Sequence, residues 1–362
     1  MNPRPCRLLA AICVALSPVF AARPPEIPVN YDEGKVPAYR LPDPLVAADG
    51  SAVREAAAWR KRRLELLEVF SREVYGRTPA GRPAGMHWET TSVDRAALGG
   101  KAVRKEITVW FTERKDGPRM HLLVYQPPGA AGAHRPRPAF LGYNYYGNAS
   151  VHADSGITLS TAWMRANAEF GIVGHRATER TRGVHAARWD VETVVARGYA
   201  TVTAYYGDVC EDRPEGLPGG AGAVFGTAEM EARRPDEWGA IGMWAWGLSR
   251  ALDYLEADAD VDARRVAVHG HSRLGKAALH KAAGKGIWIG RPVEGPGSRP
   301  LRLEPELGPD FGGLSEWPLE HIVKVLCFCH PDDSEEMRAA QEDTVTRLFA
   351  ACRRNRLEML LE

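Results

Sequence analysis

Apolar and amphipathic segments alternate along most of the chain. Runs rich in β-branched and aromatic residues predict strands, and apolar residues at helical spacing predict helices. Strands are expected at residues 106–112, 121–125, 138–143 and 200–206, and helices at residues 53–75, 190–197 and, after an N-cap at Asp236, up to residue 255. This alternation is typical of an α/β sheet with helices on both faces.

The most informative segment is a strand, a sharp turn and a helix near the middle of the second half. Val266–Val268 predicts the strand, residues from Ala277 onward predict the helix, and Gly270-His271-Ser272 forms the turn between them. A serine in this position has the geometry of a nucleophile elbow. Its hydroxyl is lifted out of the sheet, and the helix N-terminus offers N–H groups to a developing oxyanion.

The turn departs from the G-x-S-x-G signature of such elbows at one position. Leu274 stands where the second glycine belongs, and Gly275 follows it. The pattern alone therefore also permits a structural glycine turn or a phosphate-binding turn. The flanking His269 and His271 are expected to be structural, because neighbours on a strand do not readily face the serine.

Composition and charge exclude several classes of protein. The 362 residues include 47 Lys and Arg against 46 Asp and Glu, a formal charge of +1. This balance offers no general electrostatic attraction to nucleic acid, and no apolar run reaches the roughly 20 residues that span a bilayer. The length suits one large domain or two ordinary ones.

The amino terminus resembles an export signal. Arg4 and Arg7 precede the almost wholly apolar segment Leu8–Phe20, and the residues around Ala21 suit a signal peptidase. We therefore expect residues 1–21 to be a signal peptide and the protein to be secreted or periplasmic. The alternatives are a short membrane anchor and a wrongly assigned start of the chain.

Four cysteines follow this segment, and they are too few for a disulfide scaffold. Cys210 and Cys352 stand alone, whereas Cys327 and Cys329 alternate along a predicted strand. That spacing predicts sulfurs on opposite faces of the strand, in packing roles. The sequence shows no metal-binding constellation.

Further motifs accompany the elbow segment Gly270-His271-Ser272-Arg273-Leu274-Gly275-Lys276. They are Asn30-Tyr-Asp-Glu, Glu73-Val-Tyr-Gly-Arg-Thr-Pro79, Leu98-Gly-Gly-Lys-Ala, Gly117-Pro-Arg-Met, Tyr205-Tyr-Gly-Asp208, Pro235-Asp-Glu-Trp-Gly-Ala-Ile241 and Trp244-Ala-Trp-Gly-Leu-Ser-Arg-Ala-Leu-Asp253. Together they closely resemble the glucuronoyl esterases, carbohydrate esterase family 15, in the bacterial form with histidine before serine. The resemblance runs from about residue 30 to about residue 284.

This resemblance implies a secreted α/β-hydrolase that cleaves esters between the glucuronic acid of xylan and lignin alcohols. It implies that Ser272 attacks the ester carbonyl, that Arg273 helps to stabilise the oxyanion and that Lys276 binds uronate hydroxyls. The substrate is then a carbohydrate, and no cofactor is needed. Lys276 stands one helical turn after Ser272, which allows both to face one cleft.

From about residue 285 the chain resembles another family. Trp288-Ile-Gly-Arg-Pro-Val-Glu, Glu316-Trp-Pro-Leu-Glu-His-Ile-Val-Lys324 and His330-Pro-Asp-Asp333 are similar to the aldolase-like barrel domain of unknown function that is fused to 5-dehydro-2-deoxygluconokinases. We expect strand 322–329, helix 334–354 and strand 357–361 here. The predicted fold is an α/β-hydrolase (residues 22–284) truncated after the elbow, joined near residues 283–287 to a βαβ fragment of a barrel (residues 285–362).

A serine nucleophile needs a general base, and the esterase segment that would supply it is not recognisable here. His330, beside Asp332 and Asp333, is a weak candidate, and the alternative for it is a helix-capping turn. His280 and His321 are weaker candidates. We therefore expect little or no turnover. The alternatives to an esterase are a non-catalytic or vestigial carbohydrate-binding protein and a sugar-metabolism barrel fragment.

Overall fold

The computed structural model describes residues 32–38, 40–129, 135–282, 289–295, 298–317, 319, 321–330 and 332–361. The predicted signal peptide and the predicted join at 283–287 lie outside these residues. The chain divides into two compact units, one up to Arg62 and one from Arg63 onward. The first unit holds a short 3₁₀ turn, Glu33–Lys35, and the beginning of helix α1 (Ala56–Phe70).

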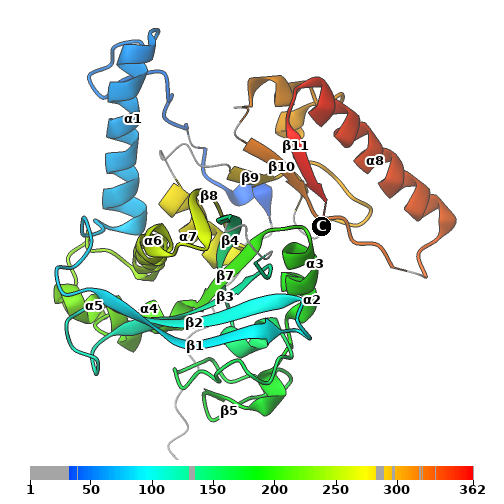
Figure 1. The fold of residues 1–362 in the computed structure, drawn as a ribbon. Helices are drawn as coiled ribbons and strands as arrows, with labels where there is room; N and C mark the ends of the chain where they lie inside the picture. Colours follow the sequence, from blue (N-terminus) through cyan, green and yellow to red (C-terminus); the bar gives the residue numbers. More distant parts are fainter. Residues whose placement is uncertain are drawn as a thin grey trace, which may run out of the picture. The chain divides into compact units, whose positions relative to one another are not determined.

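A six-stranded mixed sheet forms the centre of the second unit (Figure 1). Its strands are β1 (His87–Ala97), β2 (Ala102–Trp110), β3 (Arg119–Gln126), β4 (Arg137–Asn144), β7 (Ala200–Tyr205) and β8 (Val261–His269). The spatial order is β1-β2-β3-β7-β4-β8. The first four strands in this order pair antiparallel, whereas β4 pairs parallel with both β7 and β8.

Helices cover both faces of this sheet, as Figure 1 shows. Helices α6 (Ala240–Ala257) and α7 (Ser272–Ala282) share a core with Leu122 and Val124 of β3. Helix α3 (Val191–Ala196) packs in a second cluster with the alternate residues Leu123 and Tyr125. Because successive side chains of a strand point to opposite faces, these clusters lie on opposite sides. The predicted α/β fold class is thereby confirmed.

Local structure differs from the sequence-based expectation at three places. Strand β1 was not expected, since its solvent-facing polar residues weaken the apolar pattern. Helix α6 begins after Gly239 rather than at Asp236, because Asp236 accepts a hydrogen bond from Arg77 Nε at 2.7 Å instead. The predicted loop 211–226 contains a short helix, α5 (Gly220–Phe225), and another short helix, α4 (Tyr206–Val209), precedes it.

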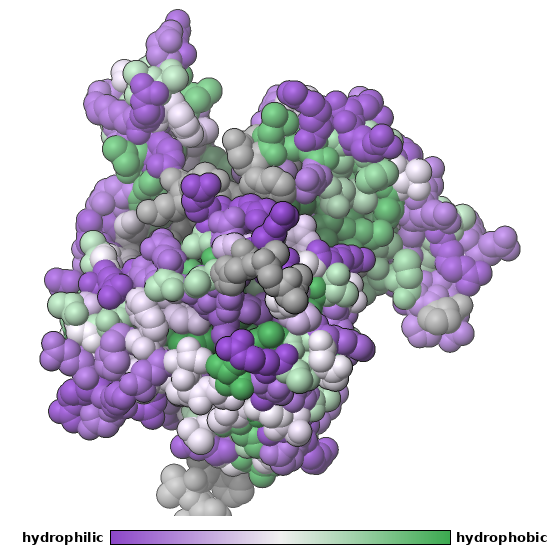
Figure 2. Space-filling view, in the orientation of Figure 1, coloured by the Kyte–Doolittle hydropathy of each residue, from purple (hydrophilic) through white to green (hydrophobic). Residues whose placement is uncertain are grey.

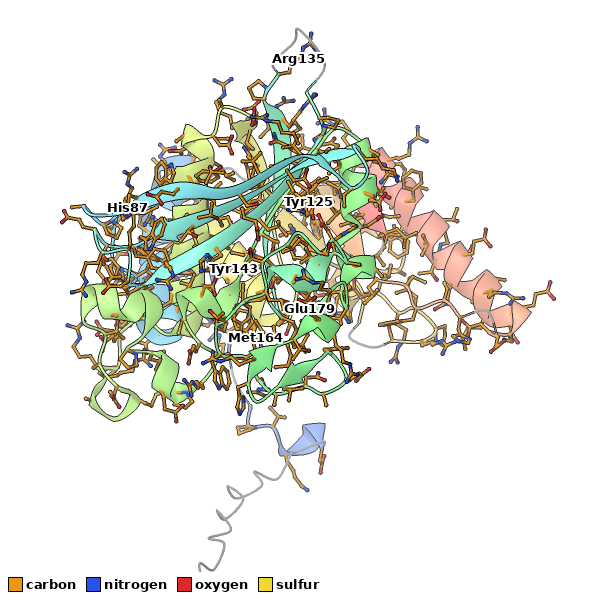
Figure 3. All side chains as sticks on the ribbon, turned by 60° about the horizontal axis from the view of Figure 1, so that its bottom comes forward. His87, Tyr125, Arg135, Tyr143, Met164 and Glu179 are labelled. Atoms are coloured by element: carbon orange, nitrogen blue, oxygen red, sulfur yellow. The ribbon has the colours of Figure 1, made fainter. Side chains whose placement is uncertain are left out.

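A long connection between β4 and α3 contributes to the core beneath the sheet. Its regular elements are short: the two-residue strands β5 (Ile172–Val173) and β6 (Arg176–Ala177), the helix α2 (Ala186–Trp189) and two 3₁₀ turns, Asn148–Val151 and Glu179–Thr181. Its Met164 is fully buried in the cluster that also contains Tyr143 of β4 (Figure 3). The connection is therefore part of the folded core, despite its polar sequence.

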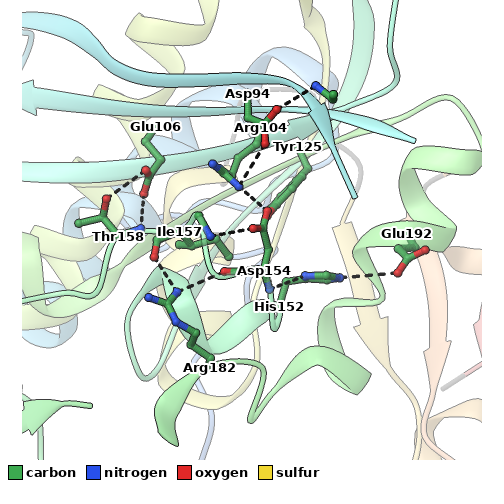
Figure 4. A network of polar contacts seen from close by, with 12 residues as sticks. Asp94, Arg104, Glu106, Tyr125, His152, Asp154, Ile157, Thr158, Arg182 and Glu192 are labelled. Carbon is green, nitrogen blue, oxygen red and sulfur yellow. Dashed lines mark hydrogen bonds and ion pairs between the residues drawn. The ribbon is translucent and has the colours of Figure 1, made fainter. Parts of the chain in front are cut away.

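Asp154 attaches this connection to the sheet through a buried polar network (Figure 4). Its carboxylate pairs with Arg104 of β2 and accepts a hydrogen bond from Tyr125 Oη at 2.6 Å. Burial alone raises the pKa of Asp154, but hydrogen bonds from Tyr125, the Gly156 N–H and Arg104 outweigh it, and the net pKa is lowered. The folded protein therefore favours the charged carboxylate of Asp154 over its protonated form.

Replacing this carboxylate should lower stability at neutral pH. A carboxyl group whose pKa is lowered on folding stabilises the protein above its unfolded pKa of about 3.9, and loses that contribution as the pH falls through the folded pKa. We expect Asp154→Asn to cost about 2 kcal/mol at pH 7 and to reduce the acid dependence below pH 4, measured by urea unfolding. The exposed Asp116→Asn is the control, and equal effects of both changes would contradict the assignment.

A separate three-stranded parallel sheet forms in the last part of the chain, in the order β11-β10-β9. Its elements are β9 (Ile289–Pro292), β10 (His321–Val325), α8 (Glu335–Arg354) and β11 (Glu358–Leu361). The cluster of buried residues from Val293 to Leu357 is its own hydrophobic core. The expected strand–helix–strand order is present, although the first strand ends at Val325 and not at Cys329.

The surface in Figure 2 carries mostly hydrophilic side chains, as the ordinary charged fraction of 26% suggests. Hydrophilic side chains cover most of the face drawn in Figure 2, and apolar side chains gather in patches among them. No helix among the described residues is both long and apolar enough to cross a membrane.

Candidate active site

The turn between β8 and α7 places Ser272 in a strained backbone conformation. Its φ angle is 53°, in the left-handed region that side chains other than glycine rarely adopt. Ser272 is the first residue of α7, and its side chain is exposed. This strand–turn–helix geometry with a strained, exposed serine is that of a nucleophile elbow, as the sequence predicts.

Gly270 allows the turn to close. A Cβ atom at this position would lie 2.3 Å from the carbonyl oxygen of Leu274 and 2.8 Å from the nitrogen of Gly275. Both are backbone atoms of the first turn of α7 and are not easily displaced. The strand can therefore pass so close to the helix only where no side chain is present.

The carboxyl ends of three neighbouring parallel strands bring further groups to this turn. Tyr145 follows β4, Tyr206 follows β7, and Ser272 follows β8. In open α/β sheets, ligands bind outside these ends of the strands. Asp212 comes from the loop after α4 and joins them, although it is 61 residues away from its partner Arg273 in sequence.

Arg273 is held from two sides. Its guanidinium forms an ion pair with Asp212, and it lies over the ring of Tyr145, 5.7 Å from the ring centroid. Burial opposes the charge on Arg273 and is the largest single effect, but Asp212, Tyr206 and Tyr145 together outweigh it. The pKa of Arg273 is therefore raised, and its cation is favoured. The hydroxyl of Tyr206 also lies 3.4 Å from Asp212 Oδ2, which further positions the carboxylate.

The hydroxyl of Tyr145 connects this group to the elbow. It donates a hydrogen bond of 2.6 Å to the carbonyl oxygen of His271, the residue before Ser272. Burial raises the pKa of Tyr145, and the nearby Arg273 charge opposes that rise. Tyr145 therefore remains a neutral donor at ordinary pH and braces the strained turn.

Lys276, the predicted sugar-binding residue, stands on the same helix. It is exposed, four residues after Ser272, and positions four apart share one face of a helix. The structure thus places Ser272, Arg273 and Lys276 together in the first turns of α7, and among the described residues no cluster of three or more metal-ligating side chains accompanies them.

The histidines have other contacts. Within residues 32–282, as far as the structure describes them, no histidine nitrogen hydrogen-bonds to Ser272. The ring of His269 meets the ring of Trp189 at 5.2 Å, and His280 stacks on Tyr75 at 4.4 Å. His269 and His280 thus have packing roles, and in the described part of residues 32–282 no histidine is placed as a base hydrogen-bonded to Ser272.

The remaining histidine candidates belong to the second sheet. His330 lies in the turn before α8, where its Nδ1 accepts from the Asp332 N–H at 3.2 Å and its own N–H donates to Asp333 at 2.9 Å. Ser334 caps the same helix by accepting from the Met337 N–H. This is the capping arrangement that the sequence left open as the alternative for His330. His321 begins β10 and meets the ring of Trp317.

Sequence reasoning missed Asp212, Tyr145 and Tyr206. A usable signal was present, because Tyr206 is the last residue of one predicted strand and Tyr145 lies two residues after another, where the groups of a site gather in α/β sheets. The sequence did not show that those strands are neighbours of the elbow strand. That neighbourhood follows from the order β7-β4-β8.

Together, the sheet and the elbow define an α/β-hydrolase fold with a serine at the nucleophile position. Similar proteins agree. The chain is 43% identical over 256 residues to the carbohydrate esterase MZ0003 of an unknown prokaryotic organism, covering 70% of this chain and 58% of that protein. A solved glucuronoyl esterase from Solibacter usitatus is 44% identical, with a TM-score of 0.61, over 69% of this chain and 62% of that one.

A second solved glucuronoyl esterase from Solibacter usitatus is 35% identical, with a TM-score of 0.64, over 88% of both chains. The chain belongs to the glucuronoyl esterase family. It nevertheless spans less than two thirds of the length of MZ0003 and of the first Solibacter structure. The esterase activity of these longer relatives is therefore only proposed for this chain.

Another family overlaps the end of the esterase-like part. A model described as an uncharacterized protein conserved in bacteria (DUF2090) matches residues 229–362. This match includes the second sheet and also α6 and α7 of the first. The specific resemblance of residues 285–362 to a kinase-fused, aldolase-like barrel domain stays a prediction.

Proposed function

We propose that this chain is a serine carboxylic-ester hydrolase of the glucuronoyl esterase type, which acts on uronate esters linking xylan to lignin alcohols. Ser272 attacks the ester carbonyl and forms an acyl-enzyme. The N-terminus of α7 and Arg273 stabilise the oxyanion, and Lys276 donates hydrogen bonds to the hydroxyls of the uronate.

The observation that carries this proposal is the strained Ser272 at an elbow beside a fixed cation. Backbone strain of this kind persists only where the surroundings enforce it, and it is concentrated at functional sites. Here Gly270 permits the close turn and Tyr145 braces it. Arg273 is held by Asp212 and Tyr145 next to the serine, where negative charge develops on the substrate.

A second candidate function is carbohydrate binding without turnover. It is favoured by the histidine contacts, because no described histidine within residues 32–282 hydrogen-bonds to Ser272. A serine without a base is a weak nucleophile, whereas Lys276 and Arg273 retain their ability to bind a uronate. In this candidate, Ser272 contributes little to affinity and Lys276 contributes much.

Hydrolysis of a benzyl glucuronate ester by the purified chain tests the two candidates. Hydrolysis above the buffer rate that requires Ser272 supports the esterase. Glucuronate binding that is lost in Lys276→Ala and kept in Ser272→Ala, with no hydrolysis, supports the binding protein. Neither hydrolysis nor binding by the folded chain contradicts both.

Asp212 is expected to act on the same reaction as a positioning residue. Asp212→Asn removes the charge that holds Arg273 while keeping the size of the side chain. Loss of an oxyanion donor costs about 10² to 10³ in kcat. In Asp212→Asn, Arg273 is still present but no longer held by an ion pair. We therefore expect a smaller loss, about 10-fold, in kcat and not in KM. Glu211→Gln is the matched control, since Glu211 pairs with Arg213 instead; a comparable loss in the control would remove the special role of Asp212.

The organisation of the chain and its location are part of the proposal. We assign residues 22–284 to the esterase-like domain and residues 285–362 to an appended domain, supported by the separate core of the second sheet. The apolar segment Leu8–Phe20 supports export to the periplasm or medium.

A further inference from the structure

Two cysteines meet in the loop that follows β10. The Sγ atoms of Cys327 and Cys329 are 3.8 Å apart, and both thiols are free. The sequence-based expectation that they face opposite sides of a strand is wrong, because β10 ends at Val325 and the chain is irregular from there to residue 330. Outside the strand, alternation no longer separates the two side chains.

The two thiols have different surroundings. Cys329 is exposed, whereas Cys327 is half-buried, and burial together with the hydrogen bond to Cys329 raises the pKa of Cys327 to about 11. The amide of Gln341 on α8 approaches Cys329, with Nε2 at 3.7 Å from Sγ and at 3.1 Å from the carbonyl oxygen of Phe328. Exchange begins at an accessible thiol, so the exposed Cys329 is the member of the pair that meets an incoming disulfide first.

The buried side chain of Gln341 is a second, independent observation that the cysteine pair has a role beyond packing. The side chain is 1% exposed, yet its Oε1 atom has no hydrogen-bond partner. An unsatisfied buried amide is costly and calls for a reason. Its amide nitrogen meets the sulfur of Cys329 and the Phe328 carbonyl oxygen, and this placement leaves the buried Oε1 without a partner.

We propose that Cys327 and Cys329 form a thiol–disulfide exchange site that reacts with small disulfides. The Cys329 thiolate attacks one sulfur of the disulfide, forms a mixed disulfide and releases the first thiol. The Cys327 sulfur then attacks Cys329 Sγ, closes the Cys327–Cys329 bond and releases the second thiol. Both cysteine protons end on the two released thiols. The two protein thiols are thereby oxidised to one disulfide, and the small disulfide is reduced to two thiols.

The geometry favours this reaction over metal binding. Among the described residues, no third metal-ligating side chain completes a cluster with the pair. A disulfide requires the sulfurs to approach to about 2.05 Å, and the irregular loop from 326 to 330 can adjust, since no strand pairing holds it. An exported protein meets the oxidising conditions under which such bonds form.

Oxidised glutathione is the probe for this site in the full chain. After incubation and peptide mapping, we expect the fragment with Cys327 and Cys329 to lose the mass of two hydrogen atoms. Cys327→Ser should instead accumulate one glutathione on Cys329, while Cys329→Ser should react several-fold more slowly, because its remaining thiol is half-buried. The buried Cys210 and Cys352 are internal controls and should stay unmodified.

Gln341→Leu keeps the buried volume and removes the donor at the sulfur. We expect it to slow formation of the mixed disulfide several-fold, with the circular dichroism spectrum unchanged; the exposed Glu342→Gln should react like the original chain. The proposal is overturned if both thiols remain free in the folded, oxidant-treated protein, or if glutathione adds to Cys329 and no internal bond follows.

Discussion

Ser272→Ala should reduce hydrolysis of a benzyl glucuronate ester to the rate in buffer. In complete serine hydrolases, loss of the nucleophile lowers kcat by about 10⁶-fold, and a general base contributes about 10² to 10⁴ of such a rate. No described histidine within residues 32–282 hydrogen-bonds to Ser272. We therefore expect a smaller ratio for this chain, about 10²-fold to 10⁴-fold.

A serine outside the elbow is the control for Ser272→Ala, because it undergoes the same chemical change at another position. Ser249 lies on α6, where its hydroxyl donates to the Ala245 carbonyl oxygen at 3.3 Å. Ser249→Ala should leave hydrolysis unchanged. The measurement is initial-rate hydrolysis at matched protein concentration, and equal rates for Ser272→Ala and the original chain would falsify the elbow mechanism. His330→Ala in parallel tests the remaining histidine: loss of hydrolysis in it assigns His330 as the base.

Gly270→Ala should strongly destabilise the elbow. The added Cβ would meet three backbone atoms of Leu274 and Gly275 at 2.3, 2.6 and 2.8 Å. Relief of such overlap requires movement of the first turn of α7, which carries Ser272. We expect a loss of about 3 kcal/mol in the free energy of unfolding, together with loss of hydrolysis, measured by urea denaturation and by the ester assay.

Gly129→Ala separates the effect of crowding from that of losing a glycine. A Cβ at Gly129 meets nothing within 4 Å, and its backbone is not in the left-handed region. The change should leave the free energy of unfolding within about 0.5 kcal/mol. If Gly270→Ala is as stable as this control, the close approach of β8 and α7 is not required for folding.

The elbow was predictable because it is local. A strand of apolar residues, a glycine turn and an amphipathic helix are contiguous between Val266 and the end of α7, and short-range sterics determine their conformation. The same holds for strand, helix and strand in the second sheet. The predicted N-cap at Asp236 failed for the opposite reason: Arg77, 159 residues away, binds this carboxylate in the folded chain.

The sequence by itself therefore determined the α/β class, the position of Ser272 and its nearness to Arg273 and Lys276, since all three stand within five residues of one helix. Only the tertiary structure decided that Asp212 and Tyr145 hold Arg273, and that Cys327 meets Cys329 beside Gln341. The physical reason is that these contacts depend on strand order and on where strands end. Both are set by packing between segments distant in sequence, which local propensity does not encode.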